Sequence, residues 1–294
     1  MKKRDRKLFA LWAAAALLLG VSQTAYADGP AGPASDQEAI LLETERASGP
    51  AGPAAEAGMS TGEEGAAAEA GEAGEIISAG DTANGAAGER LVDPNRPMVA
   101  LTFDDGPYAP VGNRIMDCLE LYQGRATFFV VGNRIPSYRD EILRMKTNGH
   151  EVANHTQEHR YLTGLTAAQV QAQMEACNQA IAAVTGEAPA LVRLPGGLYN
   201  NTVLSVIHQP VIMWSIDTKD WKTRNAANTV QVILSQVQDG DIILMHELYG
   251  ATADAVEAVV PALAEQGYQL VTVSELAACR GGLAPGVIYS AFRQ

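Results

Sequence analysis

The sequence predicts an α/β fold built on parallel strands. Two observations support it: apolar segments typical of buried strands alternate with amphipathic helical segments, and several expected helices end at a glycine. Such alternation forms a parallel sheet with right-handed crossovers, either doubly wound or closed into a barrel. The expected strands are 98–103, 126–131, 151–154, 190–194, 211–216, 241–245 and 269–273, and the expected helices are 112–122, 139–148, 167–184, 202–208, 230–238 and 252–265.

The N-terminus has the pattern of a secretory signal peptide, residues 1–27. Five basic residues precede an uncharged segment, residues 8–20, and Ala25-Tyr26-Ala27 supplies small residues for cleavage. The apolar segment is short for a membrane span, which needs about 20 residues. An uncleaved anchor is the alternative. In both cases we expect the rest of the chain to be secreted, or held at the cell envelope.

Residues 28–90 are rich in Gly, Ala, Pro and Glu and almost without aromatic residues. Such a segment buries too little apolar surface to offset chain entropy, so a disordered acidic linker is expected. It carries about −11 of the formal net charge of −13. This acidic balance argues against a nucleic-acid-binding protein.

Residues 91–294 are expected to form one domain. Its three cysteines, Cys118, Cys177 and Cys279, show no metal-binding spacing. Their odd number leaves at least one thiol free. Buried structural thiols are expected, with a Cys177–Cys279 bridge as a possibility.

The first expected strand runs into Asp104 and Asp105, and Gly106-Pro107 then ends it. Two adjacent carboxylates at the tip of a buried strand are costly unless a metal ion or an arginine compensates their charge. An ordinary turn is the alternative, since Asp-Gly and Gly-Pro are common turn residues.

His155 and His159 follow the third expected strand. Histidines four residues apart lie on one face of a helical turn, where both imidazoles can bind one ion. Two histidines and one carboxylate form a three-ligand metal site that leaves positions open for water. The alternative is a polar loop with two solvated imidazoles.

Other polar residues follow the remaining strands. Arg193 lies at the end of the fourth strand and can keep a carboxylate ionised. The segment Asp217-Thr218-Lys219-Asp220-Trp221 follows the fifth, and His246 the sixth. A buried aspartate can orient a histidine, and a tryptophan can form the wall of a pocket. The alternatives are a surface ion pair for the charged residues, a core indole for Trp221 and a structural histidine for His246.

Three further residues are expected to have structural roles. Thr252 is predicted to be the N-cap of the last expected helix. His150 and His208 do not follow strands and are interpreted as structural. All other candidates share one rim of the sheet, because the carboxyl ends of parallel strands meet there.

Five motifs occur in the order found in polysaccharide deacetylases of carbohydrate esterase family 4, the NodB homology domain. They are T-F-D-D-G-P at 102–107, H-T-x-x-H at 155–159, R-x-P at 193–195, D-x-x-D-W at 217–221 and L-x-H at 244–246. The resemblance covers about residues 95–276. It implies a distorted (β/α) barrel of about seven parallel strands and a divalent metal, usually Zn²⁺, with Co²⁺ or another ion as an alternative.

The resemblance also implies a role for each residue. Asp104 resembles the catalytic base and Arg193 the residue that positions it, while His246 resembles the catalytic acid, tuned by Asp220. The implied metal ligands are Asp105, His155 and His159, and the implied pocket residues are Gly196, Trp221 and Leu244. Gly196 departs from the family, which commonly has tyrosine there. The backbone donor is kept, and a more open wall is expected.

The expected function is removal of N-acetyl groups from N-acetylhexosamine residues of an extracellular polysaccharide, peptidoglycan or chitin-like oligomers, with release of acetate. The alternatives are an O-esterase acting on acetylated xylan and a non-catalytic carbohydrate-binding module. We expect a monomer that contacts the membrane only through an uncleaved N-terminal segment.

Overall fold

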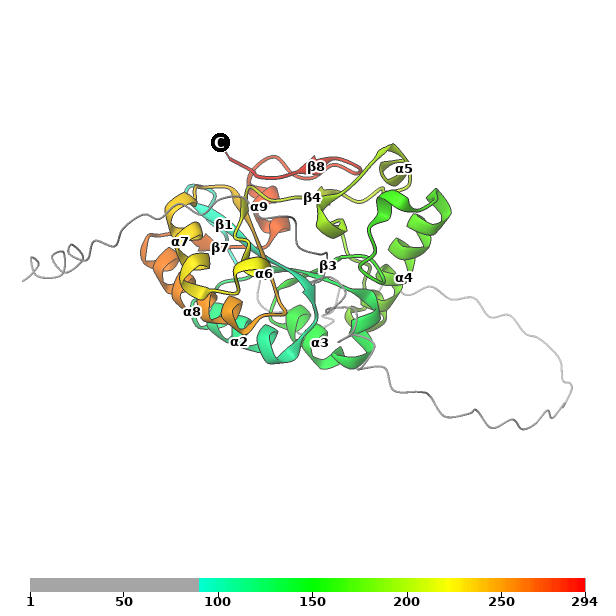
Figure 1. Cartoon of the computed structure of the whole chain (residues 1–294). Helices are drawn as coiled ribbons and strands as arrows, with labels where there is room; N and C mark the ends of the chain where they lie inside the picture. Colours follow the sequence, from blue (N-terminus) through cyan, green and yellow to red (C-terminus); the bar gives the residue numbers. More distant parts are fainter. Residues whose placement is uncertain (1–89, 294) are drawn as a thin grey trace, which may run out of the picture. The chain divides into compact units, whose positions relative to one another are not determined.

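The computed structural model describes residues 90–293. The predicted signal peptide and all but the last residue of the predicted linker lie outside these residues. The predicted α/β class with parallel strands is confirmed (Figure 1). Within residues 90–293, every helix is too short or too polar to span a lipid bilayer.

One six-stranded sheet forms the centre of the domain. Its strands are β1 (Met98–Gly106), β2 (Thr127–Val130), β3 (Glu151–Asn154), β5 (Ile216–Asp217), β6 (Asp241–His246) and β7 (Gln269–Leu270). The order is β3-β2-β1-β6-β5, with β7 also paired to β1, and every pair is parallel. Two short strands, β4 (Val211–Ile212) and β8 (Ile288–Tyr289), pair separately.

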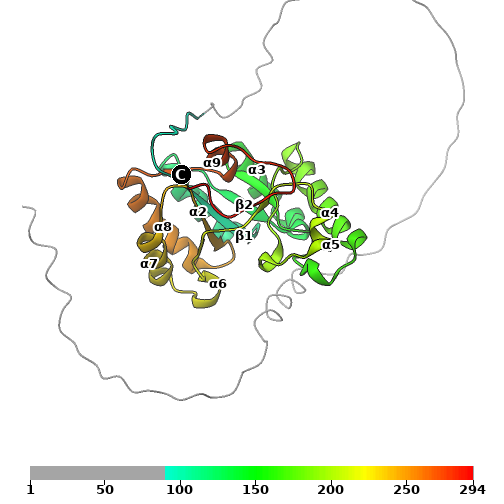
Figure 2. The ribbon, with the colours of Figure 1, turned by 90° about the horizontal axis from the view of Figure 1, so that it is seen from above.

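Helices surround the sheet. They are α2 (Ala109–Leu121), α3 (Arg139–Thr147), α4 (Ala167–Thr185), α5 (Asn201–Leu204), α6 (Asp220–Thr223), α7 (Ala226–Gln236), α8 (Gly250–Glu265) and α9 (Val273–Cys279), with 3₁₀ turns η1 (Gly132–Ser137), η2 (Leu162–Gly164) and η3 (Pro195–Gly197). Viewed from above, α7 and α8 lie on one side of β1 and β2, and α4 and α5 on the other (Figure 2).

Two predicted strands are interrupted in the structure. The fourth strand, 190–194, contributes only Val192, which bridges Asn154 of β3 and Val211 of β4. The fifth, 211–216, is broken into β4 and β5. The buried guanidinium of Arg193 accounts for this break, because it donates to the backbone oxygens of Ile212 and Met213, at 3.0 Å each, which a regular ladder would otherwise use. The strand order β5-β6-β1-β2-β3 continues through Val192 to β4. These strands thus form a distorted barrel.

Some elements were not predicted or begin elsewhere. Helices α6 and α9 and strand β8 were missed. Helix α7 begins four residues before its predicted start, because the Asn225 side chain accepts a hydrogen bond from Asn228 N and caps it. All three cysteines are free thiols, so the possible Cys177–Cys279 bridge is not formed.

Strand β1 divides the core into two layers. Val99, Leu101 and Phe103 face the surrounding helices, whereas Met98 and Ala100 face the barrel interior. This alternation follows from the two-residue repeat of a strand. Asp104 continues the interior series, which carries it to the carboxyl end of the barrel.

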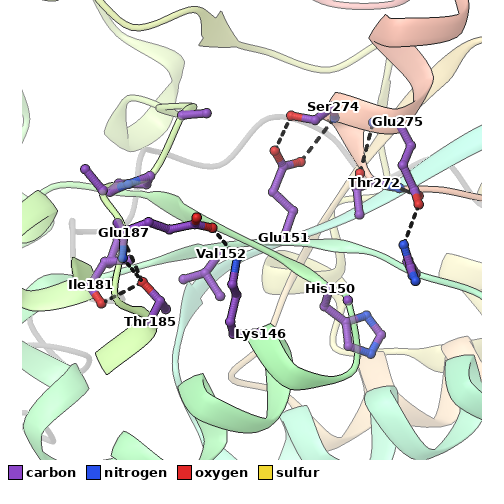
Figure 3. A pocket seen from close by; sticks show the side chains of 15 residues that line it. Lys146, His150, Glu151, Val152, Ile181, Thr185, Glu187, Thr272, Ser274 and Glu275 are labelled. Carbon is purple, nitrogen blue, oxygen red and sulfur yellow. Dashed lines mark hydrogen bonds and ion pairs between the residues drawn. The ribbon is translucent and has the colours of Figure 1, made fainter. Parts of the chain in front are cut away.

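A cavity of about 410 Å³ lies at the opposite end of the strands, beside Glu151, the first residue of β3 (Figure 3). Its charged groups are paired with one another or with neighbours. Glu151 accepts from Thr127 and Ser274, Arg125 pairs with Glu275, and Lys146 with Glu187. The predicted structural role of His150 agrees with its place here, since its Nδ1 accepts from Ala126 N. His208 is exposed before β4.

Candidate active site

A bulge at the end of β1 brings the two aspartates to one rim. Neighbouring residues of a regular strand point to opposite faces. Here the register of β1 against β2 shifts between Asp104 and Gly106, and Asp105 has a φ of 71°. A bulge redirects a side chain in this way. Asp105 therefore does not turn back toward the helices, and both carboxylates face the candidate site.

Asp105, His155 and His159 form a cluster that can hold a metal ion. Their ligand atoms all lie within 4.8 Å of one another. Asp105 Oδ1 is 3.4 Å from His155 Nε2 and 3.1 Å from His159 Nε2. Among residues 90–293 this buried oxygen has no hydrogen-bond partner. An orphaned carboxylate oxygen facing two imidazole nitrogens fits a divalent cation with nitrogen and oxygen ligands.

The two histidines converge from a loop, so the predicted helical turn is wrong. Residues 155–161 form no helix, and Thr156 and His159 have φ values of 69° and 54°. The Asn154 side chain accepts from Thr156 N at 2.6 Å, and Thr156 Oγ1 accepts from His159 N at 3.1 Å. These side-chain contacts with the backbone replace helical hydrogen bonds.

His155 is held in the orientation that a metal ligand requires. It is buried, and its Nδ1 lies 2.8 Å from the backbone oxygen of Arg193. Because a carbonyl only accepts, Nδ1 carries a proton, and Nε2 is the ring nitrogen directed at Asp105 and available to a metal ion. His159 is less constrained, with 38% of its side chain exposed.

Arg193 compensates the charge of Asp104. It is fully buried, and its Nη1 lies 2.7 Å from Asp104 Oδ1 and donates to Thr102 Oγ1 as well. Its guanidinium carbon is 4.0 Å from the ring centre of Phe129, a cation–π contact. Asp104 is thereby fixed, and its second oxygen is 3.7 Å from His155 Nε2.

His246 and the buried Asp220 form a hydrogen-bonded pair across the site. Strand pairing places His246 opposite Asp104. His246 Nδ1 is 2.8 Å from Asp220 Oδ1, and its backbone N donates to Asp220 Oδ2. Trp221 N donates to the same carboxylate. Asp220 thus fixes both the ring and the backbone of His246.

Thr252 is not the predicted N-cap of α8, whose N-cap is Tyr249. Its buried hydroxyl instead donates to Asp220 Oδ2 at 2.7 Å. The signal for this role was its place in the first turn of α8, six residues after His246, where a hydroxyl can reach a neighbouring strand end. Asp217 does not join this network. It instead forms an ion pair with the exposed Lys219, which is the surface ion pair given as the alternative.

The charges of the site shift the pKa values of two groups in opposite directions. Burial opposes ionisation of Asp105, but the facing imidazoles outweigh it, His159 most of all, and hold its pKa well below the usual range. Burial also opposes protonation of His246, yet the hydrogen bond to Asp220 and the charges of Asp105, Asp220 and Asp104 raise its pKa to about 9. An ionised ligand and a protonated histidine therefore coexist near neutral pH.

The expected open wall at Gly196 is partly filled by Tyr161. Gly196 has a φ of 63°, and a Cβ on it would lie 2.9 Å from Tyr161 Cε1. Tyr161 was missed, although it follows His159 by two residues on the same rim. Trp221 is 43% exposed beside Asp220, whereas Leu244 is buried within β6.

Comparison with known proteins agrees with this geometry. The family model described as "Polysaccharide deacetylase" matches residues 92–210. The chain is 42% identical over 188 residues to the peptidoglycan-N-acetylmuramic acid deacetylase PdaC of Bacillus subtilis, covering 64% of this chain and 40% of the relative. It is 37% identical to the peptidoglycan-N-acetylglucosamine deacetylase PgdA of Listeria monocytogenes, covering 60% and 38%. The chain thus spans about two fifths of the length of these relatives.

Solved structures show the same likeness. The structure of PdaC from Bacillus subtilis aligns with a TM-score of 0.63 and 41% identity, over 64% of this chain and 93% of the other. A family 4 acetyl xylan esterase from Clostridium thermocellum, in complex with a cobalt ion, aligns with a TM-score of 0.64 and 29% identity over 67% and 100%. On these matches and the five motifs gathered at one rim, the chain belongs to the polysaccharide deacetylases of carbohydrate esterase family 4.

Proposed function

We propose that this chain is a metal-dependent hydrolase that removes N-acetyl groups from N-acetylhexosamine residues of an extracellular polysaccharide. Peptidoglycan is the first substrate class, because PdaC and PgdA are named for it. Chitin-like oligomers are the second, since they carry the same acetylated amine. One observation carries the proposal: a three-ligand cluster is flanked by a buried carboxylate and by a histidine with a raised pKa.

Asp105, His155 and His159 are proposed to hold the metal, with Zn²⁺ as the first choice and Co²⁺ or another divalent ion as alternatives. Such an ion, when bound, supplies Lewis-acid chemistry by polarising the amide carbonyl and lowering the pKa of water. The depressed pKa of Asp105 keeps this ligand ionised for that purpose.

Asp104 takes the proton of the attacking water. Its position is set by Arg193, which donates to Oδ1 and leaves Oδ2 toward the site. His246 then donates a proton to the departing amine, so that acetate and a free amino sugar are formed. The pKa of His246, raised to about 9, suits a general acid, because the ring still carries the proton at neutral pH. Backbone N–H of Gly196 is proposed as a donor to the developing oxyanion.

An O-esterase acting on acetylated xylan is the second candidate. The likeness to the Clostridium thermocellum acetyl xylan esterase supports it, since that alignment covers the whole of the other chain. An ester leaving group needs less help from an acid than an amine does. The two functions therefore differ in how strongly they depend on His246.

The decisive experiment measures acetate release by metal-stripped protein reconstituted with Zn²⁺ or Co²⁺, on peptidoglycan, chitin oligomers and acetylated xylan. We expect release from the two amide substrates only after a metal is added. Release from xylan alone would favour the esterase. No release from any substrate, with metal bound, would favour the carbohydrate-binding module.

His155→Ala tests the metal centre. We expect a loss of about 10²-fold or more in metal affinity, because one of three ligands and its fixed orientation are lost. Metal content after dialysis measures it. His208→Ala is the matched control, since His208 is exposed and lies outside the cluster. A His155→Ala protein that keeps its metal would place the centre elsewhere.

Tyr161→Ala tests the wall beside Gly196. We expect KM for oligosaccharide substrates to rise up to about tenfold, which corresponds to ~1.4 kcal/mol, with little change in kcat. Tyr161→Phe keeps the ring against Gly196 and should stay near the native KM. Equal values of KM for native protein and Tyr161→Ala would remove Tyr161 from the binding surface.

A further inference from the structure

Two buried glutamates meet beneath the turn that carries Asp104 and Asp105. Glu141 belongs to α3, and Glu247 directly follows the last residue of β6. Glu141 is 4% exposed and Glu247 is fully buried. A Cβ on Gly112 would collide with Oε1 of both carboxylates, so the absence of a side chain at Gly112 lets the two groups approach each other.

Glu247 contacts the turn at three points. Its side-chain Oε1 accepts a hydrogen bond from Tyr108 N at 2.8 Å, and its backbone N donates to the backbone oxygen of Asp104 at 2.9 Å. A Cβ on Gly106 would overlap Oε2. Glu247 therefore ties the segment 104–108 to the end of β6, one residue after His246.

Among residues 90–293, no arginine forms a salt bridge with either glutamate. Arg144 forms salt bridges with other residues: its Nη2 lies 2.6 Å from Asp117 Oδ1 and 3.0 Å from Glu120 Oε2. Arg134 donates its Nε to Pro107 O, and its guanidinium carbon lies 6.0 Å from the ring centre of Tyr108. The charge of Arg134, from η1, acts on both glutamates, and that of Arg144, from α3, acts on Glu141; both oppose the effect of burial only in part.

Neither oxygen of Glu141, nor Oε2 of Glu247, reaches a donor among residues 90–293. Two ionised carboxylates in this position would repel each other without compensation, which is unfavourable in a buried site. Burial raises the pKa of both groups, that of Glu141 to about 7, and the charge of Glu141 raises the pKa of Glu247 further. One proton placed between them would give the Glu141 carboxyl group the hydrogen-bond partner that it lacks.

We propose that Glu141 and Glu247 share one proton, and that this acid–carboxylate pair is a positioning element that holds the Asp104–Tyr108 turn in register with His246. The shared proton is independent of the proposed hydrolysis, and only the kinetic readout below rests on it. Neither glutamate touches a substrate in this scheme.

The pair gives the fold a specific pH dependence. A carboxyl group whose pKa is higher in the folded than in the unfolded state binds more protons when folded, so stability falls as pH rises. For Glu141 the fall spans the ordinary glutamate pKa up to about 7. Glu141→Gln is close in size and cannot ionise. We expect Tm of the native protein to fall over this window, and the Glu141→Gln curve to lack that component.

Glu175→Gln is the matched control, because it makes the same chemical change on the exposed face of α4. Infrared spectroscopy gives a direct readout, since a protonated carboxyl absorbs separately from carboxylates. We expect that band in native protein near neutral pH, its presence in Glu175→Gln, and its loss in the double variant Glu141→Gln/Glu247→Gln. Parallel Tm curves for native protein and Glu141→Gln, or no such band, would overturn the proposal.

Positioning is tested by kinetics. Glu247→Ala should lower kcat by about 10- to 100-fold, since a small displacement of reacting groups has that cost, while KM and metal content stay close to native. Glu247→Gln keeps an oxygen for Tyr108 N and should recover most of kcat. If Glu247→Ala folds but keeps native kcat, positioning is refuted. If added Mg²⁺ or Ca²⁺ raises Tm of a His155→Ala/His159→Ala protein, and Glu141→Gln abolishes that rise, a cation holds the pair and the shared proton is refuted.

Discussion

Asp104→Asn is expected to release acetate about 10²- to 10⁴-fold more slowly than the native protein, the range that loss of a positioned general base produces. Asparagine has nearly the same shape and keeps an oxygen for Arg193 Nη1, so the site remains assembled. Its amide cannot take the proton of the attacking water. Steady-state kcat from an acetate assay, at saturating metal, measures the effect.

Metal content separates the base from a ligand. Asp104 lies outside the cluster formed by Asp105, His155 and His159, so Asp104→Asn should bind metal like the native protein. Asp117→Asn is the control, because that carboxylate is exposed and forms its salt bridge with Arg144, outside the cluster. Activity of Asp104→Asn within a few-fold of native would show that another group takes the proton. Loss of the metal would make Asp104 a ligand.

The location of the site could be predicted from the sequence because the order of apolar segments indicates which residues follow parallel strands. Apolar segments identified β1, β3 and β6, and the carboxyl ends of parallel strands meet at one rim. Asp104 and His246 lie side by side because β1 and β6 pair in that register. The rule needs no knowledge of side-chain geometry, which is why it located the rim correctly.

The rule could not predict local backbone conformation. The side chains of Asn154 and Thr156 hold the histidine loop through contacts with the backbone, whereas the spacing of His155 and His159 alone indicated a helical turn. Likewise the residues of a regular strand alternate, so Asp105 would point away from Asp104 without its bulge. Positive φ at Asp105 and Thr156 leaves no trace in an apolar pattern.

Residues that act through others were the hardest to find. Thr252 has the residue type and spacing of an N-cap, and only the fold shows that its hydroxyl reaches Asp220. Glu247 directly follows the catalytic candidate His246 in sequence. Its side chain lies next to that of Glu141, on helix α3, which is far from Glu247 in sequence but close in space. Partners more than 100 residues apart in sequence meet only in the folded chain.

Asp220→Asn has the second large expected effect, on the alkaline side of the pH–rate profile. A general acid works while protonated, so kcat/KM falls as pH rises through its pKa. Asp220 raises the pKa of His246, with help from Asp105 and Asp104, to about 9 against the opposing effect of burial. Removing the adjacent charge should move the alkaline limb down by about 1 to 3 pH units, the range for one close opposite charge.

The same variant should lower kcat at neutral pH, because His246 loses both its proton and its fixed orientation. Thr252→Val separates charge from hydrogen bonding. It removes one donor to Asp220 Oδ2 but leaves the carboxylate 2.8 Å from His246 Nδ1, so its alkaline limb should stay near the native position. An unchanged limb in Asp220→Asn would mean that a group other than His246 donates the proton. A limb that moves on amide substrates but leaves ester turnover unaffected would show that the acid serves the amine leaving group, as N-deacetylation requires.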